Sequence, residues 1–160
     1  MAATARHAAT PAQRTRARRY ALQALYQWDL SGAELSAIEA QFREDEDFSK
    51  VDGDYFHELL HGVPARLEEI DGHYRDCLDR KVAELDPVER ALLRMAVYEL
   101  AWRPDVPYRV VINEAVNLGK KFGAEQAHKY VNGVLDRVAR VLRPVEHPAG
   151  TPAGGLDGRG

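Results

Sequence analysis

Helical periodicity runs through nearly every segment of this 160-residue chain, and no convincing β-strand appears in it. The clearest start signal is Asp86-Pro87-Val88-Glu89, which combines an N-cap acid, a proline at the first helical position and a glutamate at the third. The helix that it opens, to about Trp102, is apolar on nearly all sides. Such a helix must be covered on every face, so the pattern predicts a central helix around which others pack.

The other helices are predicted from the same periodicity, and together they give about seven helices in one compact all-α bundle. We expect helices over about 11–30, 35–42, 52–61, 65–78, 87–102, 107–122 and from Gly123 to 142. The acidic run 44–47 is expected to be a solvated loop, and Gly62 and Pro64 are expected to end the third helix. The apolar period continues across Gly133, which therefore favours a close helix contact there rather than a turn.

Length and composition predict one soluble domain with extended ends. We expect a flexible leader over residues 1–10, a helical domain over 11–143, and a disordered Pro/Gly-rich tail over 144–160 with almost nothing to bury. No run approaches the roughly 18 apolar residues of a membrane helix, and no secretory signal is present. Cys77 is the only cysteine, so no internal disulfide can form and a cysteine metal site is disfavoured. We therefore expect a cytoplasmic protein.

Charge is distributed unevenly along the chain. Residues 1–28 carry five basic residues and no acid, whereas residues 29–160 carry 17 basic against 25 acidic residues. The five are arginines: Arg6, Arg14, Arg16, Arg18 and Arg19. Because Arg14 and Arg18 fall on the backward extension of the first helix's apolar stripe, we expect its first turns to overhang the bundle. Such an arm is typical of proteins that bind nucleic-acid phosphates, although a solvated leader is the simpler alternative.

A second basic cluster surrounds the turn at Gly123. Its members are Lys120, Lys121, His128 and Lys129. Tyr130 lies beside this cluster, and Tyr26 lies off the main stripe of the first helix. Lysines that meet phosphates next to partly exposed rings that stack on bases suit single-stranded RNA. The alternative, that the lysines solvate the turn and both tyrosines cap the core, stays open on these residues alone.

The segment His57-Glu58-Leu59-Leu60-His61 matches H-E-x-x-H, in which two histidines bind zinc and the glutamate is the general base. A zinc peptidase is therefore an alternative function. The apolar stripe of this helix, which includes Phe56 and Val63, places both histidines on its polar flank. The longer metzincin pattern would also need Gly and His where Pro64 and Leu67 stand. We expect two surface histidines, no metal and no catalytic residue.

Three segments carry a resemblance to a known family. They are Arg18-Arg-Tyr-Ala-Leu-Gln-Ala-Leu-Tyr-Gln-Trp28, Pro87-Val-Glu-Arg-Ala-Leu-Leu-Arg-Met-Ala-Val-Tyr-Glu-Leu100 and the VPY…INEA…KKFG…HKYVNGVLD signature within 105–136. Over about residues 14–143 the chain resembles the NusB family of bacterial transcription antitermination factors. The resemblance implies an all-helical fold of two small subbundles, no enzymatic activity and no cofactor.

The resemblance also implies partners. Family members pair with NusE, a small-subunit ribosomal protein, and the pair binds boxA RNA. With other Nus factors and RNA polymerase they suppress termination, notably on ribosomal RNA operons. Some relatives dimerise, so a homodimer is compatible with these residues, as is a protein-interaction module without RNA contact.

Site residues are carried over by position. The implied RNA contacts are Arg14, Arg16, Arg18, Lys129 and Tyr130, and the charge pattern adds Arg19 and Lys121. Tyr26 and Glu89 fall where the family meets NusE. Thr15 interrupts the arm where some relatives have another arginine, which would weaken RNA binding.

Overall fold

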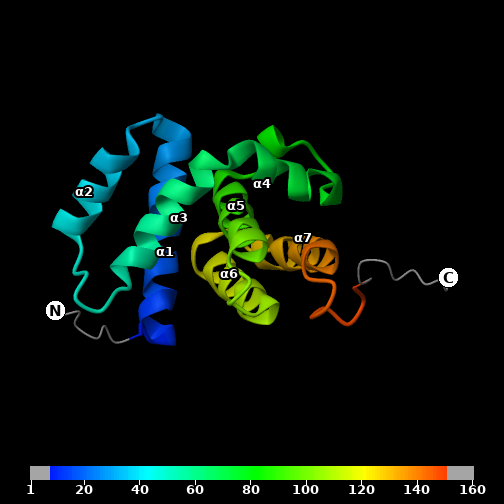
Figure 1. Cartoon of the computed structure of the whole chain (residues 1–160). Coiled ribbons are helices and arrows are strands. Elements are labelled where there is room, and N and C mark those ends of the chain that lie inside the picture. Colours follow the sequence, from blue (N-terminus) through cyan, green and yellow to red (C-terminus); the bar gives the residue numbers. More distant parts are fainter. Residues whose placement is uncertain (1–7, 151–160) are drawn as a thin grey trace.

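The computed structural model describes residues 8–150, and in this range it contains seven α-helices, two short 3₁₀ turns and no strand (Figure 1). The α-helices are α1 (Pro11–Ser31), α2 (Leu35–Asp45), α3 (Gly53–Ala65), α4 (Leu67–Tyr74), α5 (Pro87–Trp102), α6 (Tyr108–Phe122) and α7 (Ala127–Leu142). The 3₁₀ turns are η1 (Arg75–Cys77) and η2 (Val82–Glu84). None of these helices is long and apolar enough to cross a membrane. The all-α prediction is confirmed.

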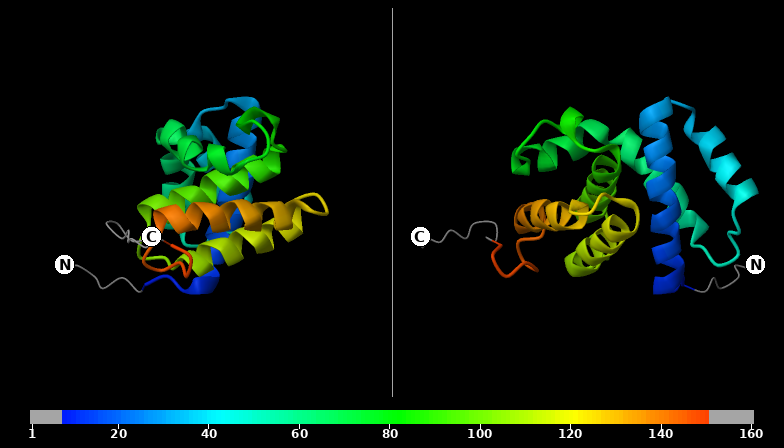
Figure 2. Two further views of the ribbon diagram at one scale, coloured as in Figure 1. Left: turned by 90° about the vertical axis from the view of Figure 1, so that its right-hand side faces the viewer. Right: turned by 180° about the vertical axis from the view of Figure 1, so that it is seen from behind.

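Helix α5 is the centre of the molecule, as its all-round apolar pattern predicts. It contacts α1, α3, α4, α6 and α7, and Leu92, Leu93 and Val97 on it are completely buried. Helices α1, α2 and α3 pack together on one side of it, and α6 and α7 pack on the other (Figures 1 and 2). These are the two expected subbundles, and α5 joins their cores.

Helix α1 begins with a complete capping box. The Thr10 hydroxyl accepts a hydrogen bond from the Gln13 amide at 3.1 Å, and the Thr10 amide donates to Gln13 Oε1 at 2.8 Å. Gly32 ends the helix in the left-handed conformation, with φ of 68°. The basic positions from Arg14 onward therefore lie on a regular helix.

The predicted roles of Gly62 and Gly133 are both wrong: the close helix contact occurs at Gly62, which was expected to end a helix, and not at Gly133. Neither Gly62 nor Pro64 ends α3, which continues to Ala65. Gly62 instead allows α5 to approach, because a Cβ there would lie 2.7 Å from the Tyr98 ring. Gly133 was expected to make a close contact, yet a Cβ there would meet nothing within 4 Å. The close approach of α6 to α7 occurs at Gly119, where a Cβ would lie 3.2 Å from the backbone of His128.

Three predicted boundaries also differ from the structure. The helix expected over 65–78 spans only Leu67–Tyr74 and is followed by the 3₁₀ turn η1. Helix α2 continues through Glu44 and Asp45, so only the second half of the acidic run is outside a helix. Residues 144–150, expected to be part of a disordered tail, pack on the domain. His147 is buried and pairs through Nε2 with Asp136 at 2.8 Å, while Glu146 accepts a hydrogen bond from the Tyr108 amide.

Buried polar partners hold residues 144–150 in place, which the low apolar content of the segment does not reveal. Arg143, directly before the segment, is fixed by hydrogen bonds to the backbone carbonyls of Glu99, Leu100 and Arg103, and it pairs in turn with Glu146. The rest of the predicted tail, 151–160, and residues 1–7 of the predicted leader lie outside the described residues.

Candidate functional site

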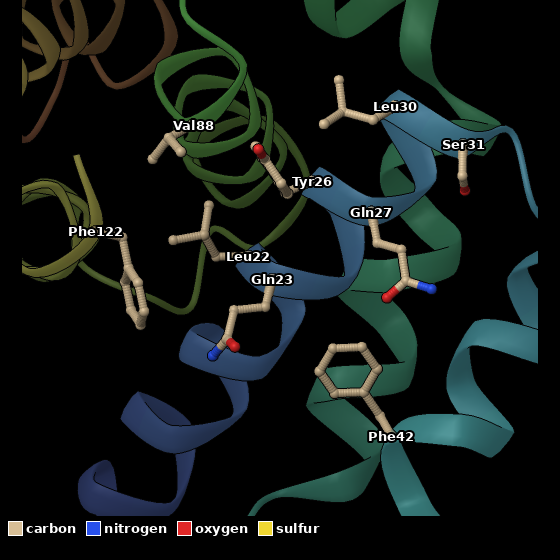
Figure 3. A pocket seen from close by; sticks show the side chains of 9 residues that line it. All are labelled: Leu22, Gln23, Tyr26, Gln27, Leu30, Ser31, Phe42, Val88 and Phe122. Carbon is tan, nitrogen blue, oxygen red and sulfur yellow. The ribbon is translucent and has the colours of Figure 1, made fainter. Parts of the chain in front are cut away.

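An open, largely apolar groove of about 590 Å³ runs along α1 (Figure 3). Its lining comes from α1, α2, α5 and α6: Leu22, Gln23, Tyr26, Gln27, Leu30, Ser31, Phe42, Val88 and Phe122. Val88 and Phe122 lie on one side of α1 and Phe42 on the other. Tyr26 is 38% exposed and Leu30 56% exposed. Large apolar side chains exposed together in a groove are typical of a protein-binding surface.

Glu89, the second predicted partner contact, is not among the groove's lining residues but follows one of them, Val88, at the start of α5. Its pKa is raised, first by partial burial and then by the nearby Asp86 carboxylate. The charges of Asp79 and Arg80 also act on it. Glu89 therefore lies in a partly desolvated position, where a hydrogen-bond donor from a partner gains more than at an open surface.

The loop after η1 carries Asp79 and Arg80, whose charges act on Glu89 and which both contact Tyr130. The Tyr130 hydroxyl donates to Asp79 Oδ1 at 2.9 Å, and the Arg80 guanidinium lies 4.6 Å above the centre of the Tyr130 ring. Hydrogen bonds from Arg80 and Tyr130 lower the pKa of Asp79 to about 2. The sequence did not identify Asp79 and Arg80 as site residues. Two adjacent opposite charges near an expected helix end do not indicate that they contact a tyrosine far along the chain.

A smaller groove of about 150 Å³ brings two predicted RNA contacts together. It lies between α1 and α6 and is lined by Thr15, Arg19, Glu114, Asn117, Leu118 and Lys121. Lys121 is exposed, and the Arg19 guanidinium stacks 5.5 Å from the centre of the Tyr20 ring. Lys121 lines this groove and the next residue, Phe122, lines the apolar groove, so the end of α6 contributes to both grooves. Lys129, also exposed, is on the first turn of α7.

Arg6 lies outside the described residues, and the other three arm arginines within them are tied to the domain. Arg14 pairs with Asp52 at 3.3 Å and lies 4.2 Å above the Tyr55 ring. Arg16 donates to the Lys50 carbonyl at 3.0 Å. Both side chains are half-buried, so they present less charge to a ligand than a free arm would.

The expectation that Arg18 overhangs the bundle is wrong. Its side chain is 3% exposed and makes a bidentate pair with Glu99 on α5, with N–O distances of 2.9 to 3.1 Å. The Tyr55 hydroxyl donates a short hydrogen bond to the same carboxylate. Burial alone would lower the pKa of Arg18, but the hydrogen bond and charge of Glu99 outweigh it and raise the pKa.

The sequence pattern gives no indication of this counterion, because Glu99 lies between the buried apolar residues Tyr98 and Leu100 of α5. Glu114 adds a second pair to Arg18 at 3.2 Å and also accepts a hydrogen bond from Thr15. Arg18 therefore belongs to the core, and we no longer assign it to RNA.

The peptidase alternative fails on the position of its general base. Glu58 faces away from the histidines: it accepts a hydrogen bond from the Tyr98 hydroxyl at 2.9 Å and pairs with Arg103 at 2.7 Å. A general base must reach the metal-bound water, and this carboxylate is engaged elsewhere. The described residues therefore do not assemble a zinc-peptidase centre.

Comparison with known proteins gives consistent matches over most of the chain. The model of the NusB family matches residues 15–140. The chain is 58% identical over 137 residues to the transcription antitermination protein NusB of Alcanivorax borkumensis, covering 86% of this chain and 91% of that protein. The solved structure of T. maritima NusB is similar with a TM-score of 0.71 and 30% identity, covering 88% of this chain and 96% of that one.

A chain in the crystal structure of the antitermination factors NusB and NusE in complex with dsRNA is similar to the same degree. Its TM-score is 0.71 at 30% identity, and the match covers 81% of this chain and 97% of that chain.

Proposed function

The chain belongs to the NusB family of transcription antitermination proteins, and from this membership we propose that it binds boxA-type RNA together with NusE. In this role it acts in the cytoplasm with other Nus factors and RNA polymerase to suppress termination, notably on ribosomal RNA operons. The observation that carries the proposal is the exposed apolar groove along α1, which shares helices α1 and α6 with the groove between Arg19 and Lys121.

NusE occupies the apolar groove in this proposal. Tyr26 and Leu30 are the large exposed side chains that a partner would bury, and Val88 and Phe122 form the opposite wall. Burying an exposed tyrosine against a partner is a common source of binding energy. Glu89, partly desolvated next to the lining residue Val88 in the chain, accepts a hydrogen bond from the partner.

RNA occupies the adjoining basic surface. Arg19, Lys121 and Lys129 neutralise phosphates, and the half-buried Tyr130 offers its ring to a base. Arg16 lies one helical turn before Arg19 and extends the surface toward the start of α1. Arg14 contributes less than these residues, since its guanidinium already pairs with Asp52.

The test is the fluorescence anisotropy of a labelled boxA-like RNA titrated with the full chain, with and without NusE. We expect NusE to tighten RNA binding, and Tyr26→Ala to remove most of this gain by costing about 2 kcal/mol of partner binding. Val141→Ala is the matched control, because Val141 is highly exposed but outside the groove. A duplex RNA of the same sequence tests the preference for single strands.

Three results would oppose the proposal. RNA affinity that is unchanged by NusE would remove the partner from the assembly. The absence of any RNA binding in its presence would leave a protein-interaction module. A homodimer that persists when NusE is added would show that a second copy of the chain, rather than NusE, covers this face.

A further inference from the structure

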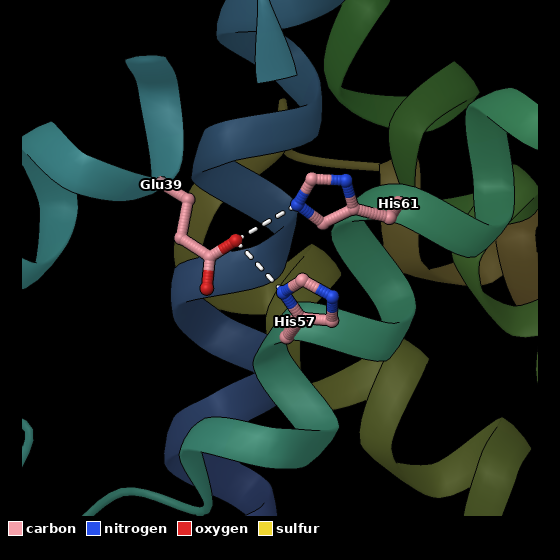
Figure 4. Close-up of side chains that lie close together, drawn as sticks. All are labelled: Glu39, His57 and His61. Atoms are coloured by element: carbon pink, nitrogen blue, oxygen red, sulfur yellow. Dashed lines mark hydrogen bonds and ion pairs between the residues drawn. The ribbon is translucent and has the colours of Figure 1, made fainter. Parts of the chain in front are cut away.

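Three metal-ligating side chains meet on the outer face of α2 and α3 (Figure 4). Glu39 Oε1 lies 2.8 Å from His57 Nδ1 and 2.8 Å from His61 Nε2. The two imidazole rings stack with their centres 4.2 Å apart. One ligand atom from each of the three residues lies within 4.8 Å of the other two.

The secondary structure explains why these side chains converge. His57 and His61 are one turn apart and therefore share a face of α3. Glu39 comes from α2, which packs beside α3. The His57 side chain is 57% exposed and that of His61 is 31% exposed, so an ion can reach the cluster from solvent. This site is separate from both grooves described above.

We propose that Glu39, His57 and His61 form a binding site for one divalent transition-metal ion, of which Zn²⁺ is the best fit. Two imidazole nitrogens and one carboxylate oxygen are a common donor set for zinc, and a water molecule completes a tetrahedron. The same donors accept Co²⁺, Ni²⁺ and Cu²⁺, whereas Mg²⁺ and Ca²⁺ prefer oxygen ligands alone.

Only small adjustments separate the observed arrangement from coordination. Ligand bonds of about 2.0 to 2.2 Å place the donor atoms of a tetrahedron roughly 3.4 Å apart, so the 2.8 Å nitrogen–oxygen contacts must open by about half an ångström. Each ring must also carry its proton on the nitrogen that points away from Glu39. His57 is exposed enough for water to satisfy that proton.

Arg43 prepares the carboxylate for this role. Its guanidinium donates to Glu39 Oε2 at 2.9 Å, and it is itself fixed by a hydrogen bond to the Gly53 carbonyl. One carboxylate oxygen is thereby occupied, and the other is directed at the histidines. Such supporting hydrogen bonds orient the ligands of many metal sites. The positive charge of Arg43 lowers the attraction for a cation, so we expect modest affinity.

The site is structural rather than hydrolytic. Its third ligand comes from α2, and Glu58 of the H-E-x-x-H segment is held on another side of α3 by Tyr98 and Arg103. Among the described elements, α2 packs mainly against α1 and α3. A bound ion therefore links α2 to α3 across their exposed side.

The experiment is titration of untagged full-length protein with ZnCl₂ by isothermal calorimetry and with CoCl₂ by visible absorption. We expect one equivalent to bind and Co²⁺ to show the absorption of a tetrahedral site. His57→Gln and Glu39→Gln should each lower the association constant by about tenfold or more, since the loss of even a supporting residue has that effect. Zn²⁺ should also raise the melting temperature of the parent protein more than that of these variants.

Two matched controls make the assignment specific. His73→Gln removes an exposed histidine elsewhere, and Glu58→Gln removes the acid that a peptidase would need; neither should change the affinity. Circular dichroism without metal verifies that every variant is folded. The proposal is overturned if the parent binds no Zn²⁺, if His57→Gln or Glu39→Gln binds as tightly as the parent, or if His73→Gln or Glu58→Gln abolishes binding.

Discussion

Replacing Arg18 by methionine tests whether the start of α1 is part of the core. Arg18 and Glu99 are 3% and 1% exposed, and Arg18→Met would leave the carboxylate buried with the Tyr55 hydroxyl as its remaining donor. Breaking a buried pair by removing one partner costs about 3 to 5 kcal/mol, because the other charge stays buried without compensation. Arg18→Met should therefore lower the free energy of unfolding by this amount.

The double variant Arg18→Met/Glu99→Leu separates the effect of the ion pair on stability from the effect of side-chain packing. With both charges removed, the main remaining cost is the unpaired Tyr55 hydroxyl, about 1 to 3 kcal/mol. The double variant should thus be more stable than Arg18→Met alone. Urea denaturation followed by circular dichroism at pH 7 measures all three proteins, with Arg137→Met as an exposed control. If Arg18→Met loses less than about 1 kcal/mol, the guanidinium behaves as a surface charge and the reasoning fails.

Gly62→Ala should destabilise the protein by about 1 to 3 kcal/mol, because the new methyl group would overlap the Tyr98 ring. Gly133→Ala should stabilise it by about 0.5 to 1 kcal/mol, because the new methyl group meets nothing and alanine favours the helix. Thermal unfolding compares the two, and equal effects would refute the packing argument. The hydrogen bond from His147 lowers the pKa of Asp136, so its stabilising effect is present above the ordinary value of 3.8 and is lost as pH falls through the lowered one. Asp136→Asn should therefore be less stable than the parent at pH 6, with the difference vanishing in acid; a constant difference would contradict this.

Local signals predicted the helices whose ends they define. The Asp86-Pro87 start predicts the beginning of α5, and the structure shows that the capping box at Thr10 and the left-handed Gly32 set the ends of α1. Both helices begin and end within a residue or two of the expected positions. These signals act within a few residues of sequence, so the sequence alone is sufficient to read them.

Several of the failed predictions depend on a distant partner. Gly62 makes room for the Tyr98 ring of α5 rather than ending α3, and Arg18 is buried because Glu99 neutralises it. Residues 144–150 are ordered by contacts with Asp136 and Tyr108 rather than by apolar content of their own. No local pattern encodes such pairings.

The candidate site likewise combines residues that the sequence identified with pairings that only the structure shows. The family resemblance assigns Tyr26 and Glu89 to the partner; in the structure Tyr26 lines the apolar groove, whereas Glu89 is partly buried and is not among the lining residues. The groove between Arg19 and Lys121 joins positions far apart in the sequence, and charge alone gave no reason to pair them. Likewise, H-E-x-x-H pointed to Glu58 as the functional acid, whereas the histidines meet Glu39 of α2.

The most direct test of the proposed interface is the salt dependence of RNA binding in the presence of NusE. Each engaged phosphate contact on single-stranded RNA contributes about 0.7 to the slope of log affinity against log salt, so Arg19→Gln/Lys121→Gln should reduce the slope by about 1.4. Arg137→Gln/Arg140→Gln removes the same charge from exposed positions on α7 and should leave the slope unchanged. Equal slopes for the two double variants would contradict the assignment of RNA to the surface beside the apolar groove.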